Sequence, residues 1–248
     1  MPGPFTAELT GRAPIAPGIV ELWFDMRTPD RLAFRAGQFV SLSVGGEAGA
    51  AAVPRRSYSI ASQSDATDRL RFIIRVIPEG AASEYLMALP IGAPVAMTGP
   101  HGFFVLDAAH AGDVVFGATG TGIAAVMPML GELGRQPLPP ASDPARRAPG
   151  RHVYWGVREE SDLFARPEIE ALAAKAGADL RVYLTAPGPT WTGRQGRITP
   201  ALLAALPELQ SPTFYLVGNG AMITEVKREL IARGVNRKTQ IRTEAFFD

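Results

Sequence analysis

The chain contains no cysteine and only three histidines among its 248 residues. Without thiols it forms no disulfide bond, and it holds neither a cysteine-ligated iron–sulfur cluster nor a thiolate zinc site. The histidines (His101, His110 and His152) are scattered along the chain, so a histidine-based metal site is not expected either. We therefore predict a protein without a metal site.

An excess of charge of either sign is also missing. The 25 Lys and Arg residues balance 24 Asp and Glu residues, and the net charge of +1 is not typical of a nucleic-acid-binding protein. No apolar run approaches the roughly 20 residues that span a bilayer, and Met1–Pro4 lacks the basic and apolar regions of a signal peptide. We expect a soluble, cytoplasmic protein with no nucleic-acid or membrane partner.

The first half of the chain is rich in β-type segments. A length of 248 residues is enough for two domains of ordinary size, and 46% hydrophobic residues is an ordinary globular composition. Segments bounded by Gly, Pro or polar clusters predict strands at Ile19–Met26, Gln38–Val44, Arg56–Ile60, Leu70–Ile77 and Pro94–Thr98. One short helix is expected at Ala82–Leu89. Short strands at this spacing favour an antiparallel barrel.

The second half alternates strand and helix patterns. Strands are expected at Asp113–Ala118, His152–Val157, Leu180–Thr185, Thr213–Val217 and Gln240–Ala245. Helices are expected between them, at Ile123–Leu133, Pro167–Ala176, Thr199–Leu206 and Met222–Arg233. This alternation predicts a parallel sheet with right-handed crossovers. We therefore divide the chain into a β-barrel domain (residues 1–107) and an α/β domain (residues 113–248), with a long exposed loop at Gly134–Gly150.

One segment, Arg55–Ser62, combines a cation, two hydroxyls and an aromatic ring on consecutive residues. In an extended strand Arg56 and Tyr58 share one face, and Ser57 and Ser59 share the other. Such a strand can hold a flat, anionic ligand, because a guanidinium binds phosphate and a phenol ring packs on a ring system. The alternative is an ordinary amphipathic strand with an arginine on its rim.

The residues Arg56–Ser59 resemble the R-x-Y-S flavin motif of the ferredoxin–NADP reductase superfamily, and further motifs follow in the family's order. The resemblance implies that the chain binds FAD. It assigns Arg56 to the flavin phosphate, Tyr58 to stacking on the isoalloxazine and Ser59 to the flavin N5, with Ser57 in the same set. It covers the chain from Gly37 to the C-terminus, and it implies a flavin-binding barrel followed by a nucleotide-binding α/β domain.

A second flavin segment is implied at the start of the predicted first helix. Gly80, Ala81, Ala82 and Ser83 resemble the family's G-x-x-S segment, whose backbone amides bind the flavin pyrophosphate. Helix N-termini suit this role because they offer free N–H groups and the positive end of the helix dipole. Taken alone, Ser83 is more simply an N-cap residue. The predicted flavin-binding set also includes Ile74, Arg75 and Val76 from the preceding strand.

Two glycine-containing segments of the second half resemble nucleotide-binding motifs. Gly120, Thr121 and Gly122 follow a strand and open a helix, where glycine lets the backbone approach a phosphate. They resemble the family's G-T-G-I-A-P motif, with Ala125 in place of the proline, although a tight strand–helix connection looks the same. The segment Val217–Met222 resembles the C-G-x-x-x-M motif, which implies that Gly218 and Met222 bind the nucleotide. Val217 replaces the family's cysteine, which lies against the nicotinamide.

The C-terminal residues also match the family. There an acidic residue precedes by two positions an aromatic residue that covers the flavin, and Glu244 and Phe246 have this spacing. The resemblance implies a catalytic set of Ser59, Glu244 and Phe246, with Glu244 as a proton or charge partner of the flavin. The alternative is a final core strand in which Phe246 only packs.

The choice between NADPH and NADH depends on cations for a 2′-phosphate. Arg158 and Arg194 resemble the 2′-phosphate arginines of bacterial ferredoxin reductases, and Arg197 lies close to Arg194 in sequence. Those enzymes often have a third arginine where this chain has Ala186. The run from Trp191 to Arg197 equally resembles NADH-using oxygenase reductases. We favour NADPH.

These features together predict a flavin-dependent oxidoreductase. It would transfer a hydride between NAD(P)H and FAD, and single electrons to or from a separate carrier: a ferredoxin, a flavodoxin or an oxygenase component. Two alternatives stay open. One is an NAD(P)H:flavin reductase that releases reduced flavin, and the other is a non-catalytic flavin-binding subunit, which the replacements at Val217 and Ala125 would allow.

Overall fold

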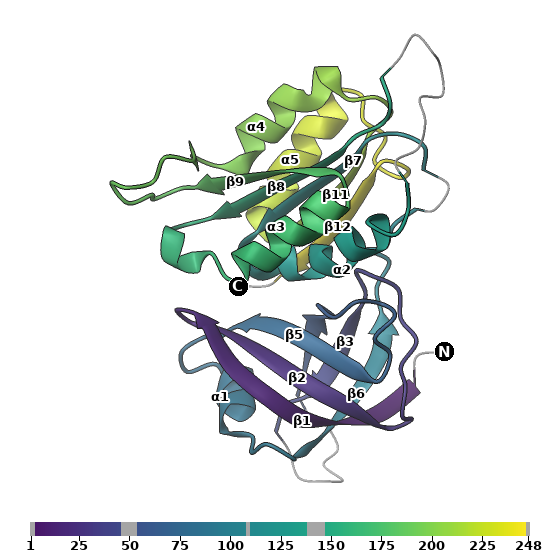
Figure 1. Ribbon diagram of the computed structural model, residues 1–248, viewed down its shortest axis with the longest axis vertical. Coiled ribbons are helices and arrows are strands. Elements are labelled where there is room, and N and C mark those ends of the chain that lie inside the picture. The colour runs from purple at the N-terminus through teal and green to yellow at the C-terminus, as the bar shows by residue number, and fades with distance from the viewer. Residues whose placement is uncertain (1–2, 46–53, 108–109, 138–146, 247–248) are drawn as a thin grey trace.

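The computed structural model describes residues 3–45, 54–107, 110–137 and 147–246, which form two domains stacked along the long axis of the molecule (Figure 1). The first domain contains β1 (Gly3–Ala16), β2 (Ile19–Thr28), β3 (Phe39–Ser43), β4 (Arg55–Ser59), β5 (Arg69–Arg75), α1 (Ala81–Ala88) and β6 (Pro94–His101). The second contains β7 (Val114–Thr119), α2 (Ile123–Leu133), β8 (Arg151–Val157), α3 (Arg166–Lys175), β9 (Ala178–Leu184), β10 (Arg194–Gln195), α4 (Ile198–Ala205), β11 (Thr213–Asn219), α5 (Gly220–Ala232) and β12 (Ile241–Phe246).

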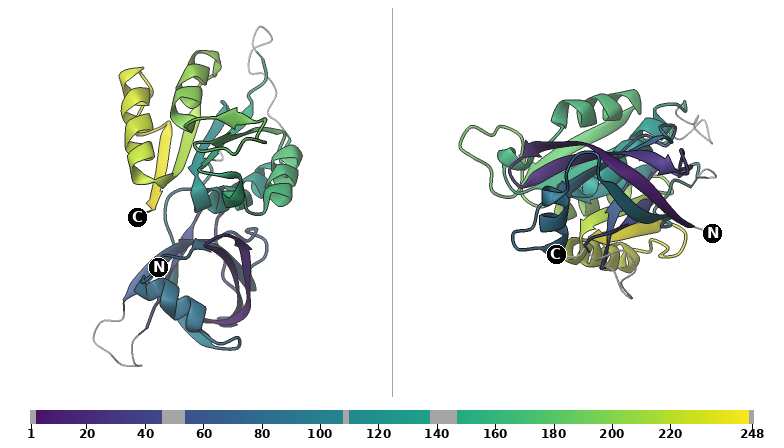
Figure 2. Two further views of the ribbon diagram at one scale, coloured as in Figure 1. Left: turned by 90° about the vertical axis from the view of Figure 1, so that its left-hand side faces the viewer. Right: turned by 90° about the horizontal axis from the view of Figure 1, so that it is seen from below.

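The first domain is a curled antiparallel sheet with the strand order β4-β3-β6-β1-β2-β5. All neighbouring strands run antiparallel. The two end strands approach each other where the Ala61 N–H donates to the Arg71 carbonyl at 2.8 Å, so the sheet curls into a barrel (Figure 2). The predicted antiparallel architecture is confirmed.

The barrel core follows from alternation along the strands. In β5 the side chains of Leu70, Phe72 and Ile74 point inward and are almost fully buried, because successive residues of a strand face opposite sides. The sequence analysis omitted β1, although Phe5, Ala7 and Leu9 alternate in the same way. Its pairing with β2 shifts register at Leu9/Gly11 and at Pro14/Ala16, and these irregularities break the pattern of a single long strand.

The second domain is a six-stranded parallel sheet with the order β10-β9-β8-β7-β11-β12. Residues of α2 and α3 pack on one face and residues of α4 and α5 on the other. This doubly wound arrangement confirms the predicted α/β class. The sequence analysis missed β10, which has only two residues and pairs only with Tyr183 and Leu184.

The two domains share one apolar core around α2, which lies on the barrel side of the parallel sheet (Figure 1). Every residue of α2 except Glu132 is buried, and barrel residues such as Ile73 and Phe104 belong to the same cluster. At Gly131 a Cβ atom would lie 1.7 Å from Oε1 of Gln63 in the barrel domain. A larger residue there would have to displace the end of the Gln63 side chain, so the two domains are in close contact at this point.

The described residues contain neither a membrane-spanning helix nor a metal-binding cluster. No helix in this part of the chain is long and apolar enough to cross a membrane. No group of three or more His, Asp or Glu side chains is arranged to hold a metal ion within the same ranges.

Candidate active site

A hydrogen bond between the two domains joins two of the predicted catalytic residues. Ser59, the last residue of β4, donates from Oγ to Oε1 of Glu244 in β12 at 2.6 Å. The two residues are 185 positions apart in the sequence. Glu244 reaches this place because β12 extends the parallel sheet beside β11, where it pairs with Val217. The contact therefore lies where the two domains meet.

The carboxyl group of Glu244 is held in a low-dielectric environment. Burial raises the pKa of Glu244, and the hydrogen bond from Ser59 partly offsets this rise. Gly102 also borders the carboxyl group. A Cβ atom at Gly102 would lie 3.0 Å from the Phe39 ring and 3.7 Å from Oε2 of Glu244. The raised pKa favours the protonated form of Glu244, which suits a residue that gives or takes a proton.

The neighbouring residues of β4 are placed as the alternation predicts. Arg56 is exposed, and its Nη1 donates to the Arg55 carbonyl at 2.9 Å. Tyr58 is half-buried, and its ring centroid lies 6.5 Å from that of Phe72. Burial raises the pKa of Tyr58 while the charge of Arg56 lowers it. A neutral phenol ring and an accessible guanidinium thus flank Ser57, which is exposed.

The first turn of α1 presents free main-chain donors. Gly80 is the N-cap residue and has no side chain that could accept a hydrogen bond from the first turn. Within the described ranges, no protein group accepts from the N–H of Ala81, Ala82 or Ser83. Ser83 is not the N-cap, which corrects that alternative. Its buried Oγ instead accepts from the Ile77 N–H at 2.8 Å and holds the preceding turn.

The predicted residues of β5 have other partners for their side chains. Ile74 is 4% exposed in the barrel core, and Arg75 lies 3.2 Å from Asp162 Oδ1 in the second domain. The Val76 N–H donates to the Gly18 carbonyl. The Arg71 main chain bonds to Ala61, on the side of β5 away from β2. Main-chain direction repeats every second residue of a strand, so the main-chain groups of Arg75 point to the same side. Flavin contacts of Ile74, Arg75 and Val76 therefore remain a prediction.

Two predicted nucleotide segments meet at the carboxyl ends of β7 and β11. A Cβ atom at Gly218, where φ is +111°, would lie 2.4 Å from Thr119 Oγ1, and one at Gly122 would lie 2.9 Å from the Val217 carbonyl. The sequence analysis missed Thr119, whose hydroxyl also accepts from the Asn219 N–H at 2.8 Å. Backbone thus packs directly on backbone beside Gly120 and Thr121, at the edge where open α/β sheets bind ligands.

Two other residues of these segments are buried. Met222 is 4% exposed, and its N–H donates to the capping Asn219 side chain at 3.0 Å. Val217 is fully buried in the core around α2. Ala125 is also fully buried, within a helix that has the predicted bounds Ile123–Leu133. The Met222 side chain thus contributes to the core, and its proposed nucleotide contact would have to come from its main chain.

The three predicted phosphate-binding arginines differ in exposure and in whether an acidic side chain pairs with them. The side chain of Arg158 is 76% exposed, and its Nε lies 3.4 Å from Glu159 Oε1. Arg194 is exposed in β10, whereas Arg197 forms an ion pair with Glu225 of α5. Neither acidic partner was predicted. Glu225 comes near Arg197 only in the folded chain, so no local pattern indicates that pair.

Phe246 ends β12 opposite Asn219 and is half-buried against the core around α2. Its place at the carboxyl edge of the sheet fits the predicted cover role, and its partial packing fits the alternative.

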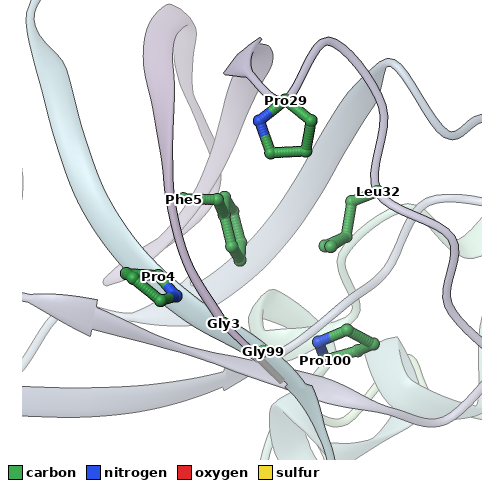
Figure 3. Close-up of a pocket in the computed structure, with 7 residues that line it drawn as sticks. All are labelled: Gly3, Pro4, Phe5, Pro29, Leu32, Gly99 and Pro100. Carbon is green, nitrogen blue, oxygen red and sulfur yellow. The ribbon is translucent and has the colours of Figure 1, made fainter. Parts of the chain in front are cut away.

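A separate hollow of about 450 Å³ lies on the barrel between Pro4, Phe5, Pro29, Leu32 and Pro100 (Figure 3). Its lining has no polar side chain, so it offers no group for the predicted chemistry.

Residues of the barrel and of the domain junction fit FAD. The free N–H groups of α1 suit a pyrophosphate, Arg56 suits a phosphate, and the half-buried ring of Tyr58 suits stacking on a flat ring system. The half-buried Ser59–Glu244 pair adds a group that can hold a proton.

Comparison with known proteins identifies the family. An oxidoreductase FAD-binding domain matches residues 6–106, and an oxidoreductase NAD-binding domain matches residues 116–228. Ferredoxin–NADP reductase B of Sorangium cellulosum is 34% identical over 247 residues, which cover 93% of this chain and 92% of that protein. The chain belongs to the ferredoxin–NADP reductase superfamily. It is therefore an oxidoreductase that uses FAD and a nicotinamide nucleotide, as the motifs predicted.

Other members of the superfamily are similar over part of their length. The anthranilate 1,2-dioxygenase electron transfer component of Acinetobacter baylyi is 32% identical over 69% of this chain and 48% of its own. The chain thus spans about half of that relative. A solved cytochrome P450 reductase from Amycolatopsis has a TM-score of 0.82 at 26% identity, over 99% of this chain and 70% of its own.

Proposed function

We propose that this member of the ferredoxin–NADP reductase superfamily transfers a hydride between NAD(P)H and FAD and exchanges single electrons with a separate carrier. The observation that carries the proposal is the 2.6 Å hydrogen bond between Ser59 and Glu244, which connects the barrel to the α/β sheet. Bound FAD would supply the redox chemistry, because a flavin can couple two-electron and one-electron transfer. The protein then has to hold the two nucleotides and manage a proton.

Each part of the site has a role in this proposal. Arg56 and the first-turn amides of α1 hold the flavin phosphates, and Tyr58 packs against the flavin ring. Ser59 donates to Glu244, and this pair holds or moves a proton at Glu244 Oε1. Phe246 would cover the flavin ring and would have to move aside for the nicotinamide. The Gly120–Gly122 turn and Gly218 accept the nicotinamide nucleotide at the edge of the sheet.

We further propose that NADPH is the preferred nucleotide. Arg158 and Arg194 are exposed near the carboxyl edge of the sheet. The Ala186 N–H donates to the Arg158 carbonyl at 2.7 Å, so the loops after β8 and β9 lie together. Arg158 is free to leave Glu159, because an exposed ion pair of this kind contributes little. Arg197 is less exposed than Arg158 and is hydrogen-bonded to Glu225 of α5, so we rank it behind Arg158.

The carrier is proposed to be a ferredoxin, a flavodoxin or an oxygenase component. These 248 residues contain no cysteine, so a cysteine-ligated cluster would have to lie outside them. Relatives include a ferredoxin–NAD(P)(+) reductase component of naphthalene dioxygenase systems and component C of a methane monooxygenase, which supports a carrier of this kind. We propose that the protein works in the cytoplasm, where nicotinamide nucleotides are available to it.

Anaerobic stopped-flow reduction with NADH and NADPH in parallel tests the proposal. We expect tightly bound FAD to be bleached by both nucleotides and faster by NADPH, and the reduced protein to pass electrons to a purified [2Fe–2S] ferredoxin or a flavodoxin. Bound flavin that neither nucleotide reduces would instead support a non-catalytic subunit. Loss of the flavin on reduction would support a flavin reductase.

A further inference from the structure

Strand β5 contributes to two interfaces at once. Leu70, Phe72 and Ile74 face the barrel core. The alternate residues Arg71, Ile73 and Arg75 face the second domain, and Ile73 belongs to the core around α2. Figure 1 shows β5 and α3 on the same side of the molecule, one in each domain. The arginine-bearing face of this strand is therefore part of the domain interface.

Arg71 makes the most extensive of these contacts. Its side chain is only 10% exposed. Nη1 and Nη2 donate to the two carboxylate oxygens of Glu168 in α3 at 2.5 and 2.9 Å, and Nε donates to Glu21 Oε1 in β2 at 2.5 Å. The guanidinium also lies 5.3 Å from the centre of the Trp23 ring. A planar, bidentate pair of this kind fixes orientation as well as distance.

The main chain of Arg71 holds the segment that follows the flavin motif. Its carbonyl accepts from the Ala61 N–H at 2.8 Å, and its N–H donates to Ser62 Oγ at 3.3 Å. Ala61 is two residues after Ser59. On the other side, Glu168 lies in the first turn of α3, which follows the loop after Arg158. Arg71 thus contacts both the segment that follows the flavin motif and the helix that follows the loop after Arg158.

We propose that Arg71 is a positioning residue that sets the orientation of the nicotinamide-binding domain relative to the flavin-binding barrel through Glu168. This inference rests on the proposed hydride transfer, in which a misplacement of about 1 Å can cost 10²-fold in rate. The apolar contact around α2 holds the domains together but is non-directional. The Arg71–Glu168 pair fixes the orientation of one domain relative to the other. Without Arg71, the carboxylates of Glu21 and Glu168 would lose this partner.

The test compares Arg71→Met and Glu168→Gln with a matched control on the same face of the same strand. Arg69 lies 4.8 Å from the Trp23 ring and 3.2 Å from Asp25 Oδ1, so it has a similar aromatic and acidic environment within the barrel alone. In Arg71→Met and Glu168→Gln we expect hydride transfer to the flavin to slow at least tenfold, while flavin retention and the nucleotide Kd change less than twofold. Arg69→Met should match the wild type.

A second readout needs neither flavin nor turnover. Because the chain has no cysteine, Asp68→Cys and Ala171→Cys, both on the surface, place one spin label on each domain. Pulsed EPR should give a broader distance distribution in Arg71→Met and Glu168→Gln than in the parent or Arg69→Met. A lowered Tm with an unchanged distribution and an unchanged hydride rate would overturn the proposal. If the parent protein is not reduced by either nucleotide, the proposed function fails, yet the EPR comparison still tests the domain contact.

Discussion

Replacing Ser59 by alanine tests the core of the proposed site, because it removes one hydrogen bond and little else. Ser59 donates to the carboxyl group of Glu244, which favours the ionised form and lowers a pKa that burial has raised. Without the hydroxyl, the pKa of Glu244 should rise further. Any limb of the pH–rate profile that depends on Glu244 should then move to higher pH.

The size of the effect follows from the contact. A hydrogen bond to a charged group contributes about 1.5–3 kcal/mol, which corresponds to about 10- to 150-fold in an equilibrium constant at 25 °C. At a fixed pH on the limb, the ratio of ionised to protonated Glu244 should therefore fall by about this factor in Ser59→Ala. Ser59→Thr keeps the hydroxyl and should leave the limb close to that of the wild type.

The assay is the rate of flavin reduction by NADPH across a range of pH, with Glu244→Gln identifying the limb. That limb should vanish in Glu244→Gln, because the amide does not titrate. Unfolding gives an independent check. Since the folded pKa of Glu244 is raised, the wild type should lose stability relative to Glu244→Gln as pH rises from the unfolded-state pKa through the folded one. A limb that moves to lower pH in Ser59→Ala, or does not move, would refute the reasoning.

Three further outcomes are expected. Arg56→Ala should reduce flavin retention, and acid release from the wild type should yield FAD, not FMN alone. Phe246→Ala should lower the nucleotide KM and weaken flavin binding by about 0.5–1.5 kcal/mol; Ile241→Ala, a core change in the same strand, should lower only the Tm. Arg158→Ala should raise the KM for NADPH about tenfold more than that for NADH, because a contact with the charged phosphate is worth about 1.5–3 kcal/mol. Equal effects on both nucleotides would remove Arg158 from the 2′-phosphate site.

Periodicity alone was enough to predict most of the fold. The helix at Ile123–Leu133 has the predicted bounds, since its apolar run ends at a glycine on each side. Strands β1 and β10 were not predicted, for physical reasons. The register shifts in β1 interrupt its alternation, and β10 exists only because Arg194 and Gln195 lie beside the edge of β9. Its two residues carry no period of their own.

The motifs indicated which residues to expect in the site, but not which of them form hydrogen bonds with each other. Motif order indicated that Ser59 and Glu244 belong to one site, yet no local pattern gives the contact between them. Ser83 shows the limit more sharply. Its position near a helix start suits an N-cap, but the Ile77 N–H behind it offers a hydrogen bond, and Gly80 takes the capping position. Such choices depend on which donors the folded chain brings within reach.

Strand β5 explains why a domain interface can escape sequence analysis. Its residues alternate between an apolar face and a face with Arg71 and Arg75, and this pattern normally indicates a strand with one side in water. The polar face is instead covered by the second domain, because arginine stems pack on apolar surface while their guanidinium groups meet acidic partners. The signal for this was Ile73, an apolar residue between two arginines on the same face. An apolar side chain at that position would not stabilise the fold if it faced solvent. Burial of Ile73 favours contact between the two domains, and the flanking ion pairs fix their relative orientation.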